Sequence, residues 1–307
     1  MPGFPCIIVV VGATGNQGGG VVRALLQSKA VEESPWYVRA ITRDPNSAKA
    51  KSFLAENQTT DNRLSLVAGH VYDKSSLQDA FTGAYGVFGI TSESYPGKLL
   101  EKKEDMRHEV EAGRNMILAA KECNVKHFIF SSLPDMITAT GGQFLNIYHM
   151  NNKQMIEQIA RENLEGFTAL IPGRQVAQWT DASHDVGLFA ARIFCMGIEK
   201  TRGKTYLVMS PRTAAFDMAK TFTQVTGQPA IHNPISAEEF GELAVPFVGP
   251  AFKEDAKQMM EWAAVMPADK ICYGAMDTYE DDSFKTLGLK ASSFEQWLRR
   301  SGWMGPD

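Results

Sequence analysis

Long apolar runs, clustered basic residues and an excess of one charge are all missing from this sequence. The apolar run Cys6–Val11 is far shorter than the roughly 20 residues of a membrane-spanning helix, and the N-terminus lacks the basic region and cleavage site of a signal peptide. We therefore expect no membrane association and a cytoplasmic location. The formal net charge is only −4, and no dense block of Lys and Arg occurs. Both features argue against direct binding of nucleic acid.

Cysteine and histidine are scarce and scattered. The four cysteines, Cys6, Cys123, Cys195 and Cys272, include no pair at metal-ligand or redox-motif spacing. We interpret them as reduced, partly buried thiols. The histidines His108, His127, His184 and His232 form no recognisable ligand spacing either. No metal site is expected.

Strands and helices are predicted to alternate along the first half of the chain. Apolar strands are expected at Ile7–Val11, Tyr37–Thr42, Leu64–Ala68, Val87–Ile90, His127–Phe130 and Thr168–Ile171. Helices are expected at Gln17–Ser28, Ala48–Glu56, Ser75–Phe81, Glu101–Glu122 and Met150–Glu162. Continuous apolar strands separated by helices indicate a parallel sheet covered on both faces. The fold class is therefore α/β, a Rossmann-type doubly wound parallel sheet.

The pattern becomes less regular after about Ile171. Helices are expected at Val186–Met196, Ala214–Thr226, Ala237–Leu243, Glu254–Ala264 and Ser293–Arg300, and a strand at Thr205–Met209. We divide the chain into a Rossmann domain over residues 1–171 and a smaller α/β lobe over residues 172–307, interleaved with the sheet. Ligands of such folds bind outside the carboxyl ends of the strands, so a cleft between sheet and lobe is predicted. The Met and aromatic residues of the lobe could line that cleft or form plain core.

A glycine motif follows the first strand and opens a helix. Its members, Gly12, Thr14, Gly15, Asn16, Gln17 and Gly18, give the spacing G-x-x-G-x-x-G. The glycines suit a tight turn, close approach of a pyrophosphate and close helix packing, and the helix N-terminus favours phosphate. The motif predicts dinucleotide binding, with a purely structural turn as the alternative.

The end of the second strand indicates which dinucleotide is bound. An NAD site has a carboxylate there for the ribose 2′-hydroxyl, whereas an NADP site has Arg for the 2′-phosphate. Arg43 takes that place, followed by Asp44. We therefore predict NADP(H) as the cofactor, with Arg43 as the phosphate clamp. The alternative is an exposed Arg43 paired with Asp44.

These residues carry a family resemblance. The segments Val11–Gly19, Thr42–Pro45, Phe130–Ser132, Val225–Pro229 and Pro234–Phe240 resemble the NmrA-like family, atypical members of the short-chain dehydrogenase/reductase superfamily. The resemblance implies either an NADPH-dependent reductase or a redox sensor that binds dinucleotide and a transcription factor without turnover.

The chain departs from that family in two places. Many relatives carry Gly-Asp after the third strand, where the acid contacts adenine, but here the pair is Gly69-His70. His70 could stack on the base or hydrogen-bond to it. The segment between Pro172 and Asp185 also looks shorter than in relatives, which implies a more open substrate cleft.

The expected catalytic motif is altered as well. Ordinary short-chain dehydrogenases use Tyr-x-x-x-Lys, but His149 stands four residues before Lys153, and Tyr148 is one place off. His149 and Lys153 share a helix face, whereas Tyr148 points about 100° away. The pattern is similar to that of the sensor-type relatives. His149 could transfer protons or be a structural histidine.

The remaining site candidates follow from the superfamily. Lys153 is expected to reach the nicotinamide ribose. Ser131 and Ser132 end the fifth strand, where the catalytic Ser lies, or cap the next segment. The loop Thr91–Tyr95 follows the fourth strand and is expected beneath the nicotinamide ribose, with an ordinary loop as the alternative.

Two functional hypotheses remain. The first is an NADPH-dependent reductase of a small carbonyl, imine or enone, with Lys153, His149 and Ser131 as catalytic residues. The second is a non-catalytic NADP(H) sensor whose lobe binds a regulatory protein. The missing tyrosine favours the sensor, and the apolar lobe favours a small-molecule substrate. The sequence does not indicate an oligomeric state.

Overall fold

One parallel sheet organises most of the molecule. The computed structural model describes residues 6–28, 35–173 and 180–306. Its main sheet contains seven strands, β1 Ile7–Val10, β2 Tyr37–Thr42, β3 Leu64–Ala68, β4 Gly86–Gly89, β5 His127–Ser131, β6 Phe167–Pro172 and β7 Thr205–Val208. The strands pair in parallel in the order β3-β2-β1-β4-β5-β6-β7. The order reverses between β1 and β4, where doubly wound folds bind ligands.

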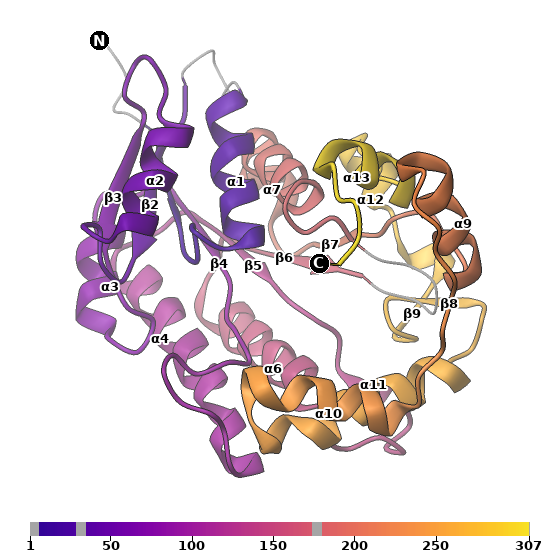
Figure 1. The fold of residues 1–307 in the computed structure, drawn as a ribbon. Helices are drawn as coiled ribbons and strands as arrows, with labels where there is room; N and C mark the ends of the chain where they lie inside the picture. Colours follow the sequence, from indigo (N-terminus) through magenta and orange to yellow (C-terminus); the bar gives the residue numbers. More distant parts are fainter. Residues whose placement is uncertain (1–5, 29–34, 174–179, 307) are drawn as a thin grey trace.

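Helices cover both faces of this sheet (Figure 1). Helices α1 Asn16–Gln27 and α7 Asp185–Met196 lie on one face, and α3 Lys74–Phe81, α4 His108–Glu122 and α6 Tyr148–Asn163 lie on the other. Helix α2 Ala48–Asn57 packs beside β3 at the edge. Alternate residues of one strand face opposite sides, so Val10 belongs to one core cluster and Val9 to the other. This arrangement confirms the expected doubly wound fold.

Helices α1 and α7 approach each other through two glycines. A Cβ atom on Gly187 would lie 2.3 Å from the carbonyl oxygen of Gly20, and one on Gly20 would lie 2.4 Å from that of Ser183. Only glycine leaves room for such close backbones. The contact fixes α1, and with it the turn that precedes α1.

The sheet extends beyond residue 171. The strand predicted at Thr205–Met209 lies in the part of the chain expected to interleave with the sheet, and β7 there pairs with β6 and continues the main sheet. Helix α7 packs on the same sheet. The crossover from β6 through α7 to β7 repeats the pattern of the first half, so the smaller lobe proper begins after β7.

One predicted helix is divided. The helix expected over Glu101–Glu122 is a 3₁₀ turn, η2 Lys103–Arg107, followed by α4. The Asp105 carboxylate accepts the backbone N–H groups of Glu101 at 3.2 Å and Lys102 at 3.1 Å. The Asp105 carboxylate thus caps the start of η2 and keeps Glu101 and Lys102 outside the helical turn.

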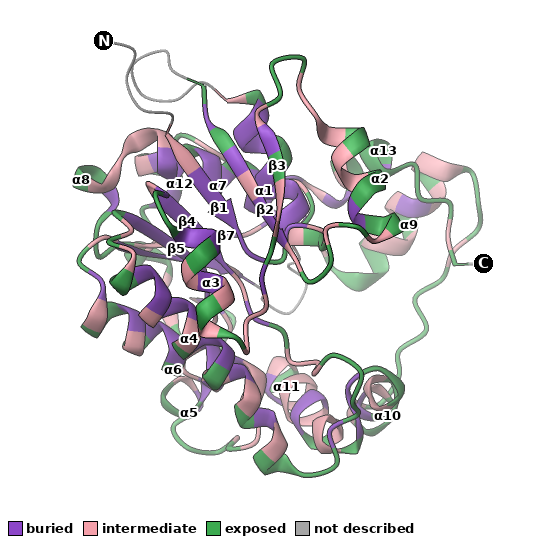
Figure 2. Ribbon diagram, turned by 90° about the vertical axis from the view of Figure 1, so that its left-hand side faces the viewer, coloured by how far each residue is buried: buried purple, intermediate pink, exposed green. Residues whose placement is uncertain are grey.

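The lobe consists of small packed groups. Helices α9 Ala215–Thr226 and α13 Phe294–Ser301 meet at Phe222 and Leu298. Helices α10 Ala237–Val248 and α11 Lys253–Val265 pair through the 3₁₀ turn η3 Pro250–Phe252. The short elements of the lobe are β8 Lys270–Ile271, β9 Met276–Asp277, η4 Thr278–Glu280 and α12 Ser283–Leu287. Two further short helices, α5 Met136–Ala139 and α8 Ile198–Thr201, precede β7. Figure 2 shows the sheet strands largely buried, whereas α9 and α10 contain few buried residues.

Candidate functional site

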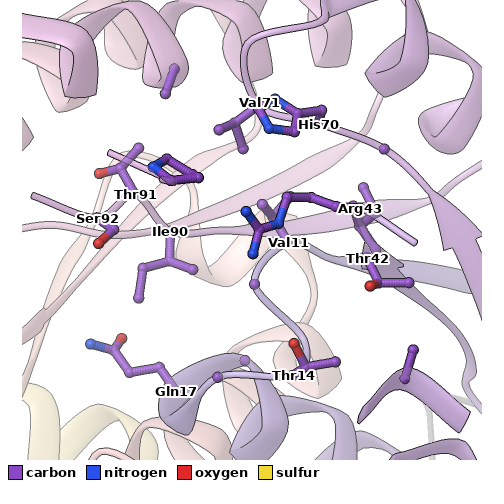
Figure 3. A pocket seen from close by; sticks show the side chains of 18 of the residues that line it. Val11, Thr14, Gln17, Thr42, Arg43, His70, Val71, Ile90, Thr91 and Ser92 are labelled. Atoms are coloured by element: carbon purple, nitrogen blue, oxygen red, sulfur yellow. The ribbon is translucent and has the colours of Figure 1, made fainter. Parts of the chain in front are cut away.

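A cavity of about 710 Å³ opens at the carboxyl ends of strands β1 to β4. Figure 3 shows this cavity from close by. Nine of the ten predicted cofactor-binding residues line it: Gly12, Thr14, Gly15, Asn16, Gln17, Gly18, Arg43, His70 and Thr91. Lys153 is the exception. The cavity therefore gathers residues that are up to 79 positions apart in the chain, as the sequence predicts.

The glycine motif forms a tight turn at the cavity. Gly12 has φ +68°, and the N–H of Gly15 donates to its carbonyl oxygen at 2.9 Å. A Cβ atom on Gly18 would lie 2.3 Å from that same oxygen. Helix α1 begins at Asn16, and its N-cap, Gly15, provides no side-chain cap. The first N–H groups of α1 are therefore left for an anion, which fits a pyrophosphate.

Arg43 follows β2 and reaches into the cavity. Figure 3 shows its side chain with His70 on one side and Thr14 on the other. Asp44 also lines the cavity, and its carboxylate accepts the N–H of Asn46 at 2.8 Å. Within residues 6–28, 35–173 and 180–306, Arg43 makes no ion pair. The alternative of an Arg43–Asp44 pair is therefore not what the structure contains.

Aromatic rings form the wall at His70. The rings of His70 and Tyr72 lie 5.4 Å apart, and Tyr72 stacks on Tyr95 at 4.9 Å. His108 Nε2 lies 3.0 Å from the carbonyl oxygen of Glu93, so this nitrogen carries the proton. Its Nδ1 consequently accepts from the Tyr72 hydroxyl at 2.5 Å. Burial raises the pKa of Tyr72, which keeps the hydroxyl protonated as a donor.

The sequence prediction missed Tyr72 and His108, and it named Tyr95 only as part of the loop that begins at Thr91. Tyr72 also lines the cavity. Its position four residues after the end of β3 was an available signal, because residues beyond the carboxyl end of a strand lie at the ligand edge of the sheet. The cluster with Tyr95 and His108 required the tertiary structure.

Lys153 lies behind the cavity wall. Its ammonium donates to the carbonyl oxygen and the hydroxyl of Thr91, both at 3.0 Å, and forms an ion pair with Glu109. The Thr91 hydroxyl in turn donates to the Glu109 carboxylate at 2.7 Å. All three N–H donors of Lys153 thus have protein acceptors. Lys153 contacts the cavity through Thr91, and its direct contact with a ribose stays a prediction.

Glu109 is another site residue that the sequence prediction overlooked. Its side chain is fully buried, and one carboxylate oxygen, Oε2, has no hydrogen-bond partner among the described residues. Ala112, Gly113 and Met116 follow it on the same buried face of α4. An acid on an otherwise apolar helix face was therefore a readable signal, because a buried carboxylate needs a charged or hydrogen-bonding partner.

His149 is held by the lobe. Both oxygens of the buried Asp255 carboxylate accept from His149, one from its backbone N–H at 2.8 Å and the other from its ring Nδ1. Burial acts to lower the pKa of His149, but the Asp255 carboxylate outweighs it and the pKa is raised. Phe252 packs against the ring at 5.5 Å. Asp255 is also a residue that the sequence prediction missed.

Ser131 ties the fifth strand to the glycine turn. Its hydroxyl donates to the side-chain oxygen of Gln17 at 2.7 Å, and the residue is buried. The cap of the following helix α5 is Asp135, so Ser131 does not serve as that cap. Ser132 donates to the carbonyl oxygen of Leu133 at 3.4 Å. Ser131 thus supports the cavity without lining it, and its catalytic role stays a prediction.

Several other expectations concern absence or length. The middle of the segment expected to be short, residues 174–179, lies outside the described residues. Among the residues that the structure describes, no group of His, Cys, Asp and Glu is arranged to hold a metal ion. In the same part of the chain, no helix is both long and apolar enough to cross a bilayer.

Comparison with known proteins gives relatives in sequence and in fold. The NmrA-like oxidoreductase FrzB of Cladobotryum sp is 36% identical over 166 residues, which cover 54% of this chain and 45% of FrzB. The match therefore spans less than half of that relative. The NADP(H) complex of Citrobacter sp. triphenylmethane reductase shares the fold with a TM-score of 0.64 at 20% identity, covering 96% of this chain and 99% of the other.

A regulatory protein has the same fold. The NADP complex of NmrA, a negative transcriptional regulator, has a TM-score of 0.63 at 18% identity, covering 97% of this chain and 92% of the other. The model of the NmrA-like family matches residues 6–171, which is more than half of the chain and includes the glycine turn, Arg43 and Lys153. The chain belongs to the NmrA-like family.

Proposed function

We propose that this protein binds NADP(H) and is an NADPH-dependent oxidoreductase of a small carbonyl, imine or enone. The observation that carries the proposal is Arg43, a guanidinium without an ion-pair partner in the described residues, in a cavity that begins at an uncapped helix N-terminus. Two separate positive features then face one cavity. A dinucleotide with an extra phosphate on its ribose matches both of them.

Each part of the cavity has a proposed role. The turn Gly12–Gly18 would hold the pyrophosphate, and Arg43 with Lys49 would hold the 2′-phosphate. His70 and Tyr72 would contact adenine, and Thr91 would lie beneath the nicotinamide ribose. When bound, the nicotinamide supplies a hydride. The chain's own residues then orient the substrate and provide a proton.

The relatives support the reductase. FrzB is named an oxidoreductase of this family, and this chain shares its fold with a triphenylmethane reductase.

The four free cysteines, Cys6, Cys123, Cys195 and Cys272, fit the reducing cytoplasm, which we propose as the location.

The test is NADPH oxidation with a panel of aldehydes, quinones, imines and enones. We expect protein-dependent loss of NADPH absorbance with at least one class. A useful control is Lys51→Ala, which removes an exposed lysine outside the cavity lining and should leave the rate unchanged. Tight NADPH binding without oxidation of any class would reject the reductase.

A second candidate, an NADP(H) sensor, is favoured by one contact. The segment that begins with Thr91 at the cavity continues to Leu100, whose N–H donates to Val248 at 2.8 Å and whose carbonyl accepts from Ala251 at 3.0 Å. This segment links the cavity to α10 and η3 of the lobe. Cofactor binding at one end could therefore shift the lobe and change how it binds a regulatory protein.

A further inference from the structure

The His149–Asp255 pair brings a lobe carboxylate to the helix that carries Lys153. Asp255 belongs to α11, and its side chain is fully buried. Because a carboxylate can only accept, the proton of the paired ring nitrogen lies on His149 Nδ1. The structure therefore fixes the tautomer. The second nitrogen, Nε2, is the one that gains and loses a proton.

That second nitrogen is available. His149 Nε2 makes no hydrogen bond within the described residues, and 13% of the side chain is exposed. The His149 ring packs on Phe252, which belongs to the same apolar cluster as Tyr95 and Leu100 of the segment that begins at Thr91. Lys153, one turn along α6, contacts Thr91 itself. His149 thus lies on the face of α6 that meets the cavity wall.

We propose that His149, held by Asp255, protonates the reduced substrate in place of the missing tyrosine. This inference rests on the proposed reductase function. The Nε2–H bond of doubly protonated His149 breaks and its electron pair stays on nitrogen. An O–H bond forms on the substrate oxygen, which holds the former C=O π pair once the hydride has added to the carbonyl carbon. The ring is left neutral, with its remaining proton on Nδ1 and still donated to the Asp255 carboxylate, and water returns the proton that Nε2 has lost. Asp255 acts as a positioning residue.

The surrounding charges favour this role. Asp255 on α11, Glu93 after β4 and Glu109 on α4 all raise the pKa of His149, against the effect of burial. On α6 itself, Lys153 opposes them, but its charge is paired with Glu109. His149 is therefore charged at a higher pH than an ordinary histidine. A proton donor with a pKa near the working pH is the most effective kind.

The first test is independent of turnover. Ring signals of histidine-labelled protein without cofactor are followed by NMR against pH, with His149 assigned by the signal lost in His149→Gln. We expect a pKa above the ordinary value of about 6.5 in the unmodified protein. In Asp255→Asn we expect a fall of one pH unit or more, about tenfold in proton affinity, because burial remains and the carboxylate is gone. A pKa that does not change in Asp255→Asn would overturn the inference.

The second test uses kcat with a substrate found in the oxidation panel. His149→Gln should lower kcat by about 100-fold while NADPH affinity changes by less than about threefold. In Asp255→Asn, the fall of kcat with rising pH should move to lower pH. His184→Gln is the matched control. His184 also pairs with an aspartate, Asp185, but at the start of α7 and not on α6. Its kcat profile should not change.

The outcomes separate the two proposals. Turnover with an unchanged pH profile in both variants would overturn the role of His149 and leave the reductase intact. If the unmodified protein oxidises NADPH with none of the substrates in the panel, the reductase proposal is rejected, and the proposed proton donor is rejected with it. If Asp255→Asn does not fold, the pH dependence of kcat in His149→Gln decides alone. The fall of kcat with rising pH that is assigned to His149 must be absent in that variant.

Discussion

Lys153 on α6 and Glu109 on α4 form an ion pair behind the wall of the cavity. The Glu109 side chain is fully buried and that of Lys153 is 10% exposed. Both groups bond to Thr91, the only one of the three residues that lines the cavity. The pair therefore fastens the end of β4 and the start of the segment that leads to the lobe.

The pair should behave as a unit when it is mutated. Lys153→Met or Glu109→Gln alone leaves a buried group unpaired and should lower the free energy of unfolding by about 3 kcal/mol. The double variant should lose clearly less than the sum of the two. Urea unfolding of the four proteins measures this. Additive losses would show that the two side chains do not support each other.

Two glycines of the turn should respond differently. Gly15 has an extended backbone (φ −95°), and a Cβ atom would lie 3.2 Å from the carbonyl oxygen of Gly12. Gly15→Val should therefore fold but weaken NADPH binding by tenfold or more, because the side chain stands where the pyrophosphate would approach. Gly18→Val should lower stability by about 1–3 kcal/mol, since its Cβ would lie 2.3 Å from the same oxygen. Thermal unfolding and NADPH titration distinguish them, and unchanged affinity in folded Gly15→Val would make the motif purely structural.

The buried His127 should make the protein sensitive to acid. Burial lowers the pKa of His127 from 6.5 to about 3. The unfolded chain then binds a proton below pH 6.5 that the folded chain refuses, so stability falls as the pH falls. Between pH 7 and pH 5 this costs about 2 kcal/mol.

The check is the difference between the unmodified protein and His127→Gln. His149, whose raised pKa acts in the opposite direction, is present in both proteins and cancels. Urea unfolding at the two pH values should show a steeper loss in the unmodified protein. Equal losses would mean that His127 takes up its proton in the folded state.

The close contact of α1 with α7 gives a prediction of stability alone. Gly187→Ala would place its Cβ 2.3 Å from the carbonyl oxygen of Gly20 and push the helices apart, so we expect a loss of about 1–3 kcal/mol. Gly203→Ala is the comparison: its Cβ would meet no atom within 4 Å, although its φ of +73° adds backbone strain. In denaturant unfolding, Gly187→Ala should have a lower free energy of unfolding than Gly203→Ala. The reverse order would show that the helices adjust easily.

The sequence predicted what depends on local pattern. The glycine turn at Gly12, the position of Arg43 after β2 and the alternation of strands and helices are set by neighbouring residues, and the structure confirms each of them. The same holds for most helix ends. For example, Ser293 caps α13 and its partner Gln296 lies three residues later.

The partners of buried charges could not be predicted in this way. Lys153 and Glu109 are 44 residues apart, and His149 and Asp255 are 106 apart. The sequence around one member of a pair does not identify the other member, because the pairing arises only when helices from different parts of the chain pack. The placement of β7 in the main sheet depends on packing for the same reason.

Cofactor preference tests the account most directly. Calorimetric titration should show NADPH binding at least about tenfold more tightly than NADH, because one charge-assisted contact to the 2′-phosphate is worth about 1.5–3 kcal/mol. Arg43→Ala should abolish most of that difference and leave NADH binding nearly unchanged, whereas Lys51→Ala, outside the cavity lining, should alter neither. Equal affinity for the two nucleotides in the unmodified protein, or an equal loss of both in Arg43→Ala, would contradict the assignment of this cavity to NADP(H).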